Sequence, residues 1–465
     1  MKKIKIGFLP LYIKLYDDIG NGAKARPRLE PFYEKLACLM EAEGAEVVRN
    51  PFCRIKPEFE AAVKAFEAAQ VDCIVTWHAA YSPSLECADA LAGTSLPVIV
   101  LDTTETYDFG PSQDAGEISY CHGIHGVMDM CNLLSRRGKP YAIAAGHISD
   151  SDVIARVVGF ARAAVAAKAF SSVRVGSIGG SFDGMGDFIV TDEEIEGRFG
   201  VKVVYADRDE LAALRQEVGE DEIAAEVAAD RESFYEISPV DDDDLRNTER
   251  NCLAVRHWME KHGLNAFTAN FREIGDDRCG LTVMPFIEAC KTLARGQGYA
   301  GEGDALTASL VGALLSGFPD TSFVEIFCPD WKGNSLLLSH MGEFNPNLTD
   351  RKPGMKKINF VFGSADDPVV AYGRYRPGAA TFLNLYRDEA GFRLLLSQVE
   401  MLDAGDDKNF ETRVRGWLRP SLPVAEFLET ISAFGVTHHS VLVYGATPEQ
   451  LAFFADLLDL PCEVI

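Results

Sequence analysis

Residues 71–101, VDCIVTWHAAYSPSLECADALAGTSLPVIVL, contain a pattern that predicts the architecture of the first third of this chain. Cys73–Thr76 is a short apolar run, Ser84–Leu91 has apolar residues at helical spacing, and Pro97–Leu101 is again rich in β-branched residues. Strands that alternate with helices of this length are typical of a parallel sheet covered by helices on both faces. The stretch therefore predicts an α/β domain.

The same alternation extends in both directions. The predicted elements around the stretch are Ile4–Leu9, Leu29–Glu43, Glu46–Val48, Phe59–Ala69, a helix over 123–134, Tyr141–Ala145 and Asp152–Ala167. Ligands of such sheets bind beyond the carboxyl ends of the strands, and the segments that follow the predicted strands are polar or aromatic. Gly7 is followed by Phe-Leu-Pro rather than by further glycines, so a nucleotide cofactor is not indicated.

A second α/β unit begins with the predicted strand Ser172–Ile178. Its further predicted elements are the helix Thr248–His262, the strand Ala266–Asn270 and the helix Met284–Arg295. The acidic run Asp241–Asp244 follows Pro239, and we interpret it as a solvated surface loop.

After about residue 320 the pattern changes to short β-type runs separated by turn residues. These runs are Ser322–Phe327, Ser335–Ser339, Ile358–Gly363, Ala380–Tyr386, Phe392–Val399, Thr412–Trp417 and Ser440–Tyr444. They predict an antiparallel sheet or small barrel. We therefore expect three domains: an N-terminal α/β domain over 1–168, a central α/β domain over 169–318 and a C-terminal β domain over 319–465.

Composition excludes several classes of partner. The chain of 465 residues has a net charge of −25, which argues against binding nucleic acid or an anionic membrane surface. No run approaches the roughly 20 apolar residues that span a bilayer, and the apolar run near Met1 is too short for a signal peptide. The 11 cysteines are scattered and form no C-x-x-C pair, so neither a disulfide framework nor structural zinc is expected. These features predict a cytoplasmic protein.

Four positions with acid or imidazole side chains are candidates for chemistry. Glu302 lies in a glycine-rich turn, Gly-Glu-Gly-Asp, that opens a predicted helix. Glu325 lies within an apolar strand, where an unpaired carboxylate is costly to bury. His340 ends one predicted strand, and the pair His438-His439 introduces another. Since side chains alternate along a strand, we expect only one histidine of that pair to point into a given site.

Two carboxylates and two imidazoles form a mixed oxygen and nitrogen ligand set. Such a set suits Mn²⁺, Co²⁺ or another octahedral divalent ion. Each residue also has a structural alternative: Glu302 is favoured by a helix dipole at this position, and His340 is compatible with a core histidine.

The segment from Gly298 through Pro346 resembles the L-arabinose isomerase family. The matching motifs are Gly-Tyr-Ala-Gly-Glu-Gly-Asp at Gly298–Asp304, Thr-Ser-Phe-Val-Glu at Thr321–Glu325, Lys-Gly-Asn-Ser at Lys332–Ser335, Ser-His-Met at Ser339–Met341 and the pair His438-His439. The resemblance, which extends to L-fucose isomerases, implies two doubly wound parallel-sheet domains of Rossmann or flavodoxin type followed by a β-barrel domain. It also implies a trimer or hexamer with active sites between subunits.

The resemblance further implies roles for individual residues. It places Mn²⁺ on Glu302, Glu325, His340 and His439, with the two glutamates also acting as acid and base. The substrate-side positions that match are Tyr81, His125, Met185 and Phe271, and the histidine is expected to reach into a neighbouring subunit.

One stretch departs from the family. Family members carry Ser-Gln-His-Leu-Tyr-Gly after the first strand, whereas this chain has Ile13 in place of the glutamine and Lys14 in place of the histidine. Tyr81 also replaces a family phenylalanine. The sugar read by this chain is therefore expected to differ from L-arabinose, and Lys14 would favour an anionic or otherwise substituted sugar.

The expected reaction is a metal-dependent interconversion of an aldose and its ketose through a cis-enediol. Two alternatives remain open from the residues: an epimerase or aldolase that uses the same metal site, and a non-catalytic sugar-binding protein.

Overall fold

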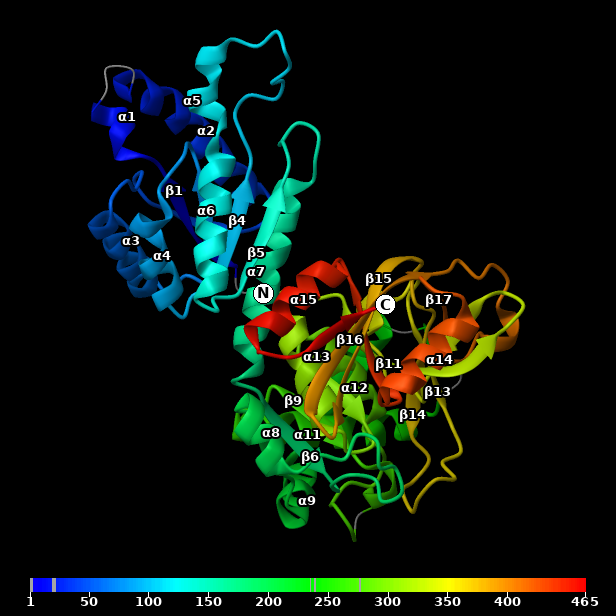
Figure 1. Ribbon diagram of the computed structural model, residues 1–465. Helices are drawn as coiled ribbons and strands as arrows, with labels where there is room; N and C mark the ends of the chain where they lie inside the picture. The colour runs from blue at the N-terminus through cyan, green and yellow to red at the C-terminus, as the bar shows by residue number, and fades with distance from the viewer. Residues whose placement is uncertain (1–2, 19–21, 235, 238–239, 276) are drawn as a thin grey trace. The chain divides into compact units, whose positions relative to one another are not determined.

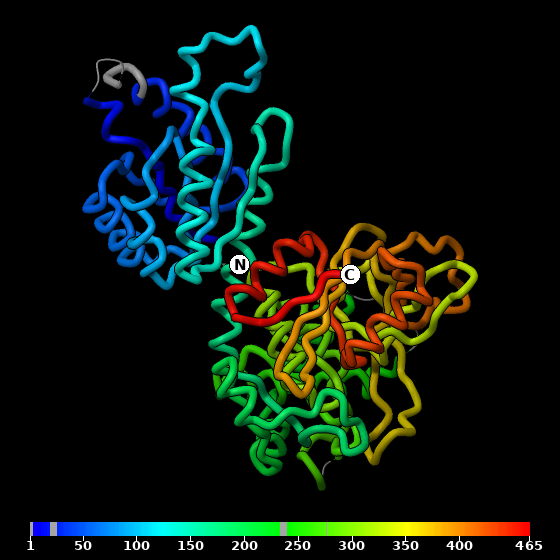
Figure 2. Tube along the Cα trace, viewed as in Figure 1, coloured from blue at the N-terminus to red at the C-terminus, as the bar shows by residue number. Residues whose placement is uncertain are grey.

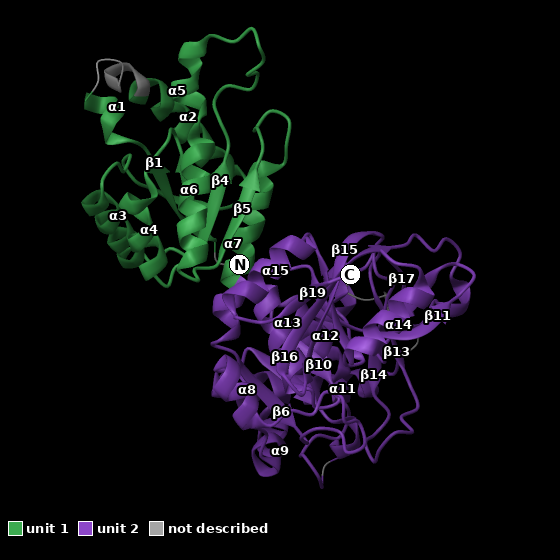
Figure 3. Ribbon diagram, in the orientation of Figure 1, with its two compact units in different colours: residues 1–165 green, residues 166–465 purple. Residues whose placement is uncertain are grey.

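The computed structural model describes residues 3–18, 22–234, 236–237, 240–275 and 277–465. The chain divides into two compact units, Met1–Val165 and Ala166–Ile465, and each is described by itself (Figure 3). The domain boundary predicted after residue 318 falls between a helix and a strand inside the second unit.

The first unit is built on a parallel sheet of order β2-β1-β3-β4-β5, counted over the described residues (Figure 1). Its strands are β1 (Lys5–Leu11), β2 (Glu46–Arg49), β3 (Cys73–His78), β4 (Val98–Asp102) and β5 (Tyr141–Ala145). Its helices are α1 (Lys14–Asp18), α2 (Gly22–Ala42), α3 (Lys56–Ala68), α4 (Ser84–Gly93), α5 (Ile118–Cys121), α6 (Gly123–Arg136) and the start of α7 (Val153–Phe170).

Both faces of this sheet are apolar, as parallel strands require. Phe8 of β1 stacks on Tyr33 of α2, with ring centroids 4.5 Å apart, and Trp77 of β3 meets the same tyrosine. Ile74, which points to the opposite face, joins the core that includes Phe59 of α3. This order is that of flavodoxin-like sheets.

The second unit begins with a smaller parallel sheet of order β10-β9-β6-β7 within the described part of the chain. Its strands are β6 (Arg174–Ile178), β7 (Lys202–Tyr205), β9 (Ala266–Ala269) and β10 (Gly298–Gly301). The accompanying helices are α8 (Asp192–Phe199), α9 (Arg208–Glu217), α10 (Glu220–Ala229), α11 (Asp242–His262), α12 (Phe286–Ala294) and α13 (Ala305–Gly317).

A closed antiparallel barrel follows. Over the described residues its order is β15-β18-β11-β12-β17-β16, and the pairing of β16 with β15 closes it. These strands are β11 (Thr321–Asp330), β12 (Ser335–Leu338), β15 (Gly378–Asp388), β16 (Gly391–Met401), β17 (Gly416–Pro420) and β18 (His439–Tyr444). In Figure 2 the chain passes through the barrel from yellow-green to red. The predicted fold class, two doubly wound sheets followed by a β-barrel, is confirmed.

Smaller elements complete the second unit. They are α14 (Val424–Phe434), α15 (Pro448–Leu457), β19 (Cys462–Val464) beside β16, and a short sheet of β8 (Glu236–Ile237), β13 (Gly354–Lys357) and β14 (Val369–Tyr372). Among the described residues, no helix is both long and apolar enough to cross a membrane.

Three local predictions are wrong. Asp241–Asp244 is not a loop: Asp241 caps α11 by accepting a hydrogen bond from the Asp243 amide, and the following acids form its first turn. Negative charge at a helix N-terminus is favourable, which explains the acidic run. Ile358–Gly363 forms no strand, and the strand predicted at Thr412–Trp417 begins only at Gly416. In the first stretch Phe360 and Phe362 line the cavity described below, whereas in the second Val414 packs into the hydrophobic core.

Candidate active site

Glu302 follows the carboxyl end of β10 in a strained turn. Its φ is +63°, a region that residues with a Cβ seldom occupy outside functional sites. Gly303 permits this turn, because a Cβ there would lie 2.2 Å from the backbone oxygen of Gly180. The backbone thereby holds the Glu302 carboxylate at a fixed place beyond the sheet.

Glu325 and His439 are neighbours across two barrel strands. They are paired in the register of β11 and β18. Nε2 of His439 lies 3.3 Å from Oε1 of Glu325 and 3.5 Å from Oε2 of Glu302. Both Glu325 and His439 are buried. Because Glu302 follows β10, its contact with His439 joins the parallel sheet to the barrel.

His340 completes the group. It lies two residues beyond the end of β12, and Nε2 of its imidazole is 2.8 Å from Oε1 of Glu325. The backbone there is fixed by a hydrogen bond from the Ser339 amide to the Glu325 carbonyl oxygen, 3.3 Å. The structure thus brings together all four residues that the sequence singled out as metal ligands.

Two further carboxylates orient the imidazoles from behind. Nδ1 of His439 is hydrogen-bonded to Oδ2 of Asp304 at 2.9 Å, and Nδ1 of His340 forms an ion pair with Glu343. Tyr299 donates a hydrogen bond to the same Glu343 carboxylate. This arrangement leaves Nε2 of each imidazole facing Glu325, which is how metal-binding histidines are usually held.

Sequence reasoning missed these orienting residues. Asp304 also caps α13 by accepting a hydrogen bond from the Thr307 amide at 2.8 Å, so its sequence context is that of an ordinary helix cap. Its second oxygen is free to bind His439. The acidic Glu343, three positions after His340, was a signal in the sequence, but only the fold shows that its carboxylate contacts the imidazole.

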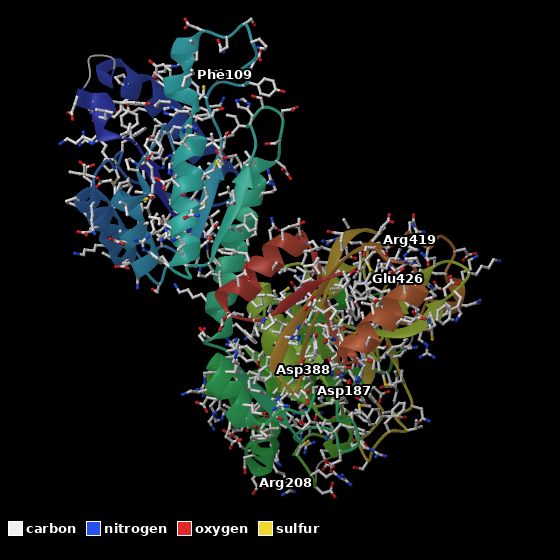
Figure 4. All side chains as sticks on the ribbon, in the orientation of Figure 1. Phe109, Asp187, Arg208, Asp388, Arg419 and Glu426 are labelled. Carbon is white, nitrogen blue, oxygen red and sulfur yellow. The ribbon has the colours of Figure 1, made fainter. Side chains whose placement is uncertain are left out.

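The expectation that only one histidine of the pair reaches the site is wrong. His438 precedes β18, so strand alternation does not apply to it, and its Nε2 lies 3.4 Å from Oε2 of Glu302. Its Nδ1 is 2.7 Å from Oδ2 of Asp187, which also accepts the His438 backbone N–H at 2.8 Å. Asp187, labelled in Figure 4, lies between β6 and α8 and was not predicted to orient a histidine.

The glutamates are anionic because the imidazoles stabilise their charge. Burial by itself raises the pKa of Glu302, but His438 and His439 outweigh burial and lower that pKa to about 2. Burial likewise opposes ionisation of Glu325, yet the charges of His340 and His439 hold its pKa below the ordinary range.

The imidazoles show the complementary effect. Burial disfavours the charged form of His340, but Glu325 and Glu343 overcome it and raise its pKa to about 10. Asp304 and Glu302 likewise raise the pKa of His439 against burial. The carboxylates of the site therefore stabilise positive charge on the imidazoles. A bound cation would take the place of the protons on His340 and His439.

A divalent cation fits the residues present. Oε1 of Glu325 and Nε2 of His439 are buried and lie in no hydrogen-bond geometry, although they are 3.3 Å apart. Two ligands at right angles on an ion, each at about 2.1 Å, are about 3 Å apart. The separations of 2.8 to 3.5 Å between the atoms of these ligands match that spacing. Glu302, His438 and His439 also form a cluster with metal-ligand spacing.

A cavity of about 480 Å³ adjoins these side chains. Glu302, Glu325 and His340 lie in its wall. The rest of the wall is mostly apolar and includes Phe271, Met284, Phe286, Phe327, Phe360, Phe362 and Phe410. Its volume is in the range of small-molecule sites, and its walls combine aromatic side chains with a few polar groups.

The remaining predicted residues fall into two groups. Phe271 lines the cavity, and Met185 is half-buried two residues before Asp187. Tyr81, His125 and Lys14 belong to the first unit. Tyr81 lies 3.5 Å from Asp129, His125 is exposed in the first turn of α6, and Lys14 is exposed at the start of α1. Their roles in substrate binding stay predictions.

Comparison with known proteins places this geometry in a family. The chain matches the L-arabinose isomerase central domain over residues 181–316 and the L-arabinose isomerase C-terminal domain over residues 320–461. These matches cover more than half of the chain and contain every residue of the Glu302 and Glu325 site.

Similar curated proteins agree. An L-arabinose isomerase of Nocardioides sp. is 27% identical over 83% of this chain and 78% of its own length. An L-arabinose isomerase of Geobacillus kaustophilus is 26% identical over 84% of this chain and 80% of its own length. One of Shouchella clausii is 25% identical over 99% of this chain and 93% of its own length. This chain belongs to the L-arabinose isomerase family and is an aldose–ketose isomerase.

Proposed function

We propose that this enzyme is a divalent-metal-dependent isomerase that uses Mn²⁺, held by Glu302, Glu325, His340 and His439. The observation that carries the proposal is the convergence of two carboxylates and two imidazoles whose Nδ1 atoms are already occupied by buried acids. Mixed oxygen and nitrogen ligands suit Mn²⁺ or Co²⁺, and no cysteine is among them.

The reaction requires a proton to move between C1 and C2 of an open-chain sugar. Removing the C2 proton of the aldose and adding a proton to its carbonyl oxygen O1 gives a cis-enediol. Adding a proton to C1 and removing the proton of O2 then gives the ketose. Glu302 and Glu325 reach the site from a sheet and a barrel, so one carboxylate can accept the proton while the other donates. A bound divalent cation would supply Lewis-acid stabilisation of the oxyanion that develops on the sugar oxygens.

The surroundings of the two glutamates support this role. His438 and His439 keep Glu302 ionised, which is the form a base requires. Phe271, Phe327 and Phe362 line the cavity and offer a sugar apolar surfaces beside the two glutamates.

The substrate is proposed as an aldose related to L-arabinose but altered at its distal end. The relatives are named L-arabinose isomerases, whereas this chain has Ile13 and Lys14 where the family has glutamine and histidine. By analogy with the family, Tyr81, His125, Met185 and Phe271 would bind the sugar, with His125 supplied by a neighbouring subunit.

We further propose a homo-oligomer, a trimer or hexamer, in the cytoplasm. All eleven cysteines are free in this structure, as a reducing compartment favours. Light scattering coupled to gel filtration tests the oligomer directly, and a monomer at micromolar concentration would contradict it.

The function is tested by a Mn²⁺-supplemented screen of aldoses. Ketose formation with unchanged carbon number, measured by proton NMR, is expected for at least one pentose, hexose or 6-substituted sugar. Products that differ only at one stereocentre, or that are shorter, would instead indicate an epimerase or an aldolase.

Removal of the metal gives a second readout. Because an ion that binds only the folded protein stabilises it, Mn²⁺ at a hundred times its dissociation constant should add about 2.7 kcal/mol to unfolding of the second unit. Dialysis against a chelator should lower the melting temperature and remove turnover, and Mn²⁺ should restore both. An unchanged melting curve and full activity after dialysis against the chelator would contradict the metal proposal.

A further inference from the structure

Among the described residues that line the cavity beside Glu302 and Glu325 there is one arginine, Arg413, and no lysine. Among the described residues its guanidinium has no ion pair, no hydrogen bond and no ring contact. The side chain is exposed, in a chain with 70 acidic and 45 basic residues. Most other arginines of the second unit pair with carboxylates; the neighbouring Arg415, for example, pairs with Asp407.

The backbone around Arg413 is fixed close to the metal ligands. Oγ of Ser339, the residue before His340, donates a hydrogen bond of 2.7 Å to the carbonyl oxygen of Val414. The Arg413 amide donates to the Phe410 carbonyl oxygen at 2.9 Å, and Phe410 also lines the cavity. Arg413 therefore directly precedes Val414, which is hydrogen-bonded to Ser339, the neighbour of His340.

A second cation lies behind Arg413. Nζ of Lys356 on β13 is 3.2 Å from Oγ1 of Thr412 and has no carboxylate partner among the described residues. Burial lowers the pKa of Lys356, and the charge of Arg413 lowers it further, so the two cations are close enough to repel each other. Such repulsion is relieved when an anion binds between or beside the two charges.

We propose that Arg413, supported by Lys356, binds an anionic group, a carboxylate or a phosphate, at the end of an aldose whose C1 and C2 lie at Glu302 and Glu325. The inference rests on the proposed function and names its substrate class. The planar guanidinium is suited to bidentate contact with either anion.

The cavity offers room for such a ligand. Phe327, Phe362 and Phe410 line it together with Arg413, and all four side chains are exposed to solvent, so an anionic group can reach the guanidinium. A cavity of about 480 Å³ has room for a six-carbon sugar with a charged substituent.

The test compares matched neutral and anionic aldoses in the presence of Mn²⁺. D-Galactose is paired with D-galacturonate, and D-ribose with D-ribose 5-phosphate, for the wild type and for Arg413→Gln and Arg413→Lys. Arg419→Gln is the control, because Arg419 is an exposed arginine of the same unit that pairs with Glu400 on the barrel surface (Figure 4).

We expect at least one anionic aldose to exceed its neutral partner in kcat/KM. Arg413→Gln should lower kcat/KM for that substrate about 10- to 100-fold, through KM, because a charge-assisted contact is lost. Neutral aldoses should change by less than about twofold, as expected for a contact that they do not make. Arg413→Lys should recover part of the loss. A response to galacturonate alone, to ribose 5-phosphate alone or to both would define the anion as carboxylate, phosphate or either.

Two results would overturn the inference. Equal kcat/KM for neutral and anionic aldoses in the wild type would exclude an anion subsite while leaving the isomerase function intact. A loss in Arg413→Gln that is the same for neutral and anionic sugars would show a structural effect only. If no aldose is converted, the proposed function fails, and calorimetric titration of galacturonate and ribose 5-phosphate into wild type and Arg413→Gln decides the subsite separately: binding lost in the variant supports it, and no binding to the wild type refutes it.

Discussion

The two parallel sheets of this enzyme have the same strand order around their switch points but different chemistry at their carboxyl ends. In the first unit, β3 ends at His78, which is buried and has no hydrogen-bond partner on either ring nitrogen among the described residues. In the second unit β10 leads to Glu302, and the barrel strands place the half-buried His340 and the buried His439 beside Glu325, where carboxylates face both imidazoles. A histidine at or near the end of a strand is thus a core residue in one unit and a metal-ligand candidate in the other.

The pKa values express this difference. Burial lowers the pKa of His78 to about 3, and Asp129 on α6 opposes burial too weakly to prevent it. At His340 the carboxylates of Glu325 and Glu343 reverse the effect of burial and raise the pKa to about 10. The fold provides the position, and the number of carboxylates within contact decides what the imidazole does there.

The largest effect should come from removing a carboxylate that faces both imidazoles. Glu325→Gln keeps the size of the side chain but removes both the proposed ligand charge and the acid–base group. Turnover of the best aldose should fall by about 10³-fold or more. Glu426→Gln, on the exposed face of α14 (Figure 4), is the control and should keep wild-type turnover. Substantial isomerisation by Glu325→Gln at saturating Mn²⁺ would remove Glu325 from the mechanism.

The next effect tests the orienting carboxylate. Asp304→Asn retains an oxygen to cap α13 but loses the charge that holds Nδ1 of His439, so Mn²⁺ affinity should fall about 10- to 100-fold. Calorimetric titration of Mn²⁺ measures this directly. Asp241→Asn makes the same change at the cap of α11 and should bind Mn²⁺ like the wild type. Equal affinities in all three proteins would show that Asp304 is only a cap.

The stability of the first unit should decrease as the pH falls, because His78 stays neutral in the folded protein. Because the pKa of His78 is lower in the folded protein than in the unfolded chain, its contribution to stability is complete above about pH 6.5 and is lost as the pH falls toward 3. Between pH 7 and pH 5 the free energy of opening β3 should fall by about 2 kcal/mol. Amide hydrogen exchange of peptides from β3 in the full chain, corrected for intrinsic rates, measures it.

The control for that experiment is a change of the same histidine. His78→Leu removes the titrating group, and since neither ring nitrogen has a partner it leaves no polar atom unsatisfied. The pH dependence of β3 exchange should vanish in His78→Leu and persist in His147→Leu, which replaces a half-exposed histidine of the same unit. An identical pH dependence in both variants would assign the effect to other groups.

The smallest effect should separate the two adjacent histidines. Both lie near Glu302, at 3.4 and 3.5 Å, but only His439 is buried and also faces Glu325. His438→Ala should therefore weaken Mn²⁺ binding by less than about tenfold, whereas His439→Ala, which removes a proposed ligand, should weaken it by more. A larger loss in His438→Ala would make His438 the ligand.

The alternation of apolar strands and helices was sufficient to predict both α/β sheets, because each sheet is buried on both faces and its strands are continuous apolar runs. The barrel was predicted from its short β-type runs. The error at Ile358–Gly363 arose where Phe360 and Phe362 line a cavity, since a hydrophobic run does not reveal whether it packs in a ladder or lines a pocket. The stretch Thr412–Trp417 joins the ladder only at Gly416. The acidic run at Asp241 was mistaken for a loop because helix caps and surface loops share the same residues.

The sequence by itself determined the fold class and singled out Glu325, because periodic apolar runs and a carboxylate inside an apolar strand are visible in one dimension. The ligand set with His439 chosen from the pair His438-His439 came from the resemblance to the family. Only the tertiary structure decided that Asp304 and Glu343 orient the imidazoles, that His438 also reaches Glu302, and that Arg413 lies unpaired in the cavity wall. Apart from the contact of Glu343 with His340, which spans three residues, these facts depend on distances between side chains that are far apart along the chain. No local pattern records such distances, because they are set by how the barrel packs against the sheet.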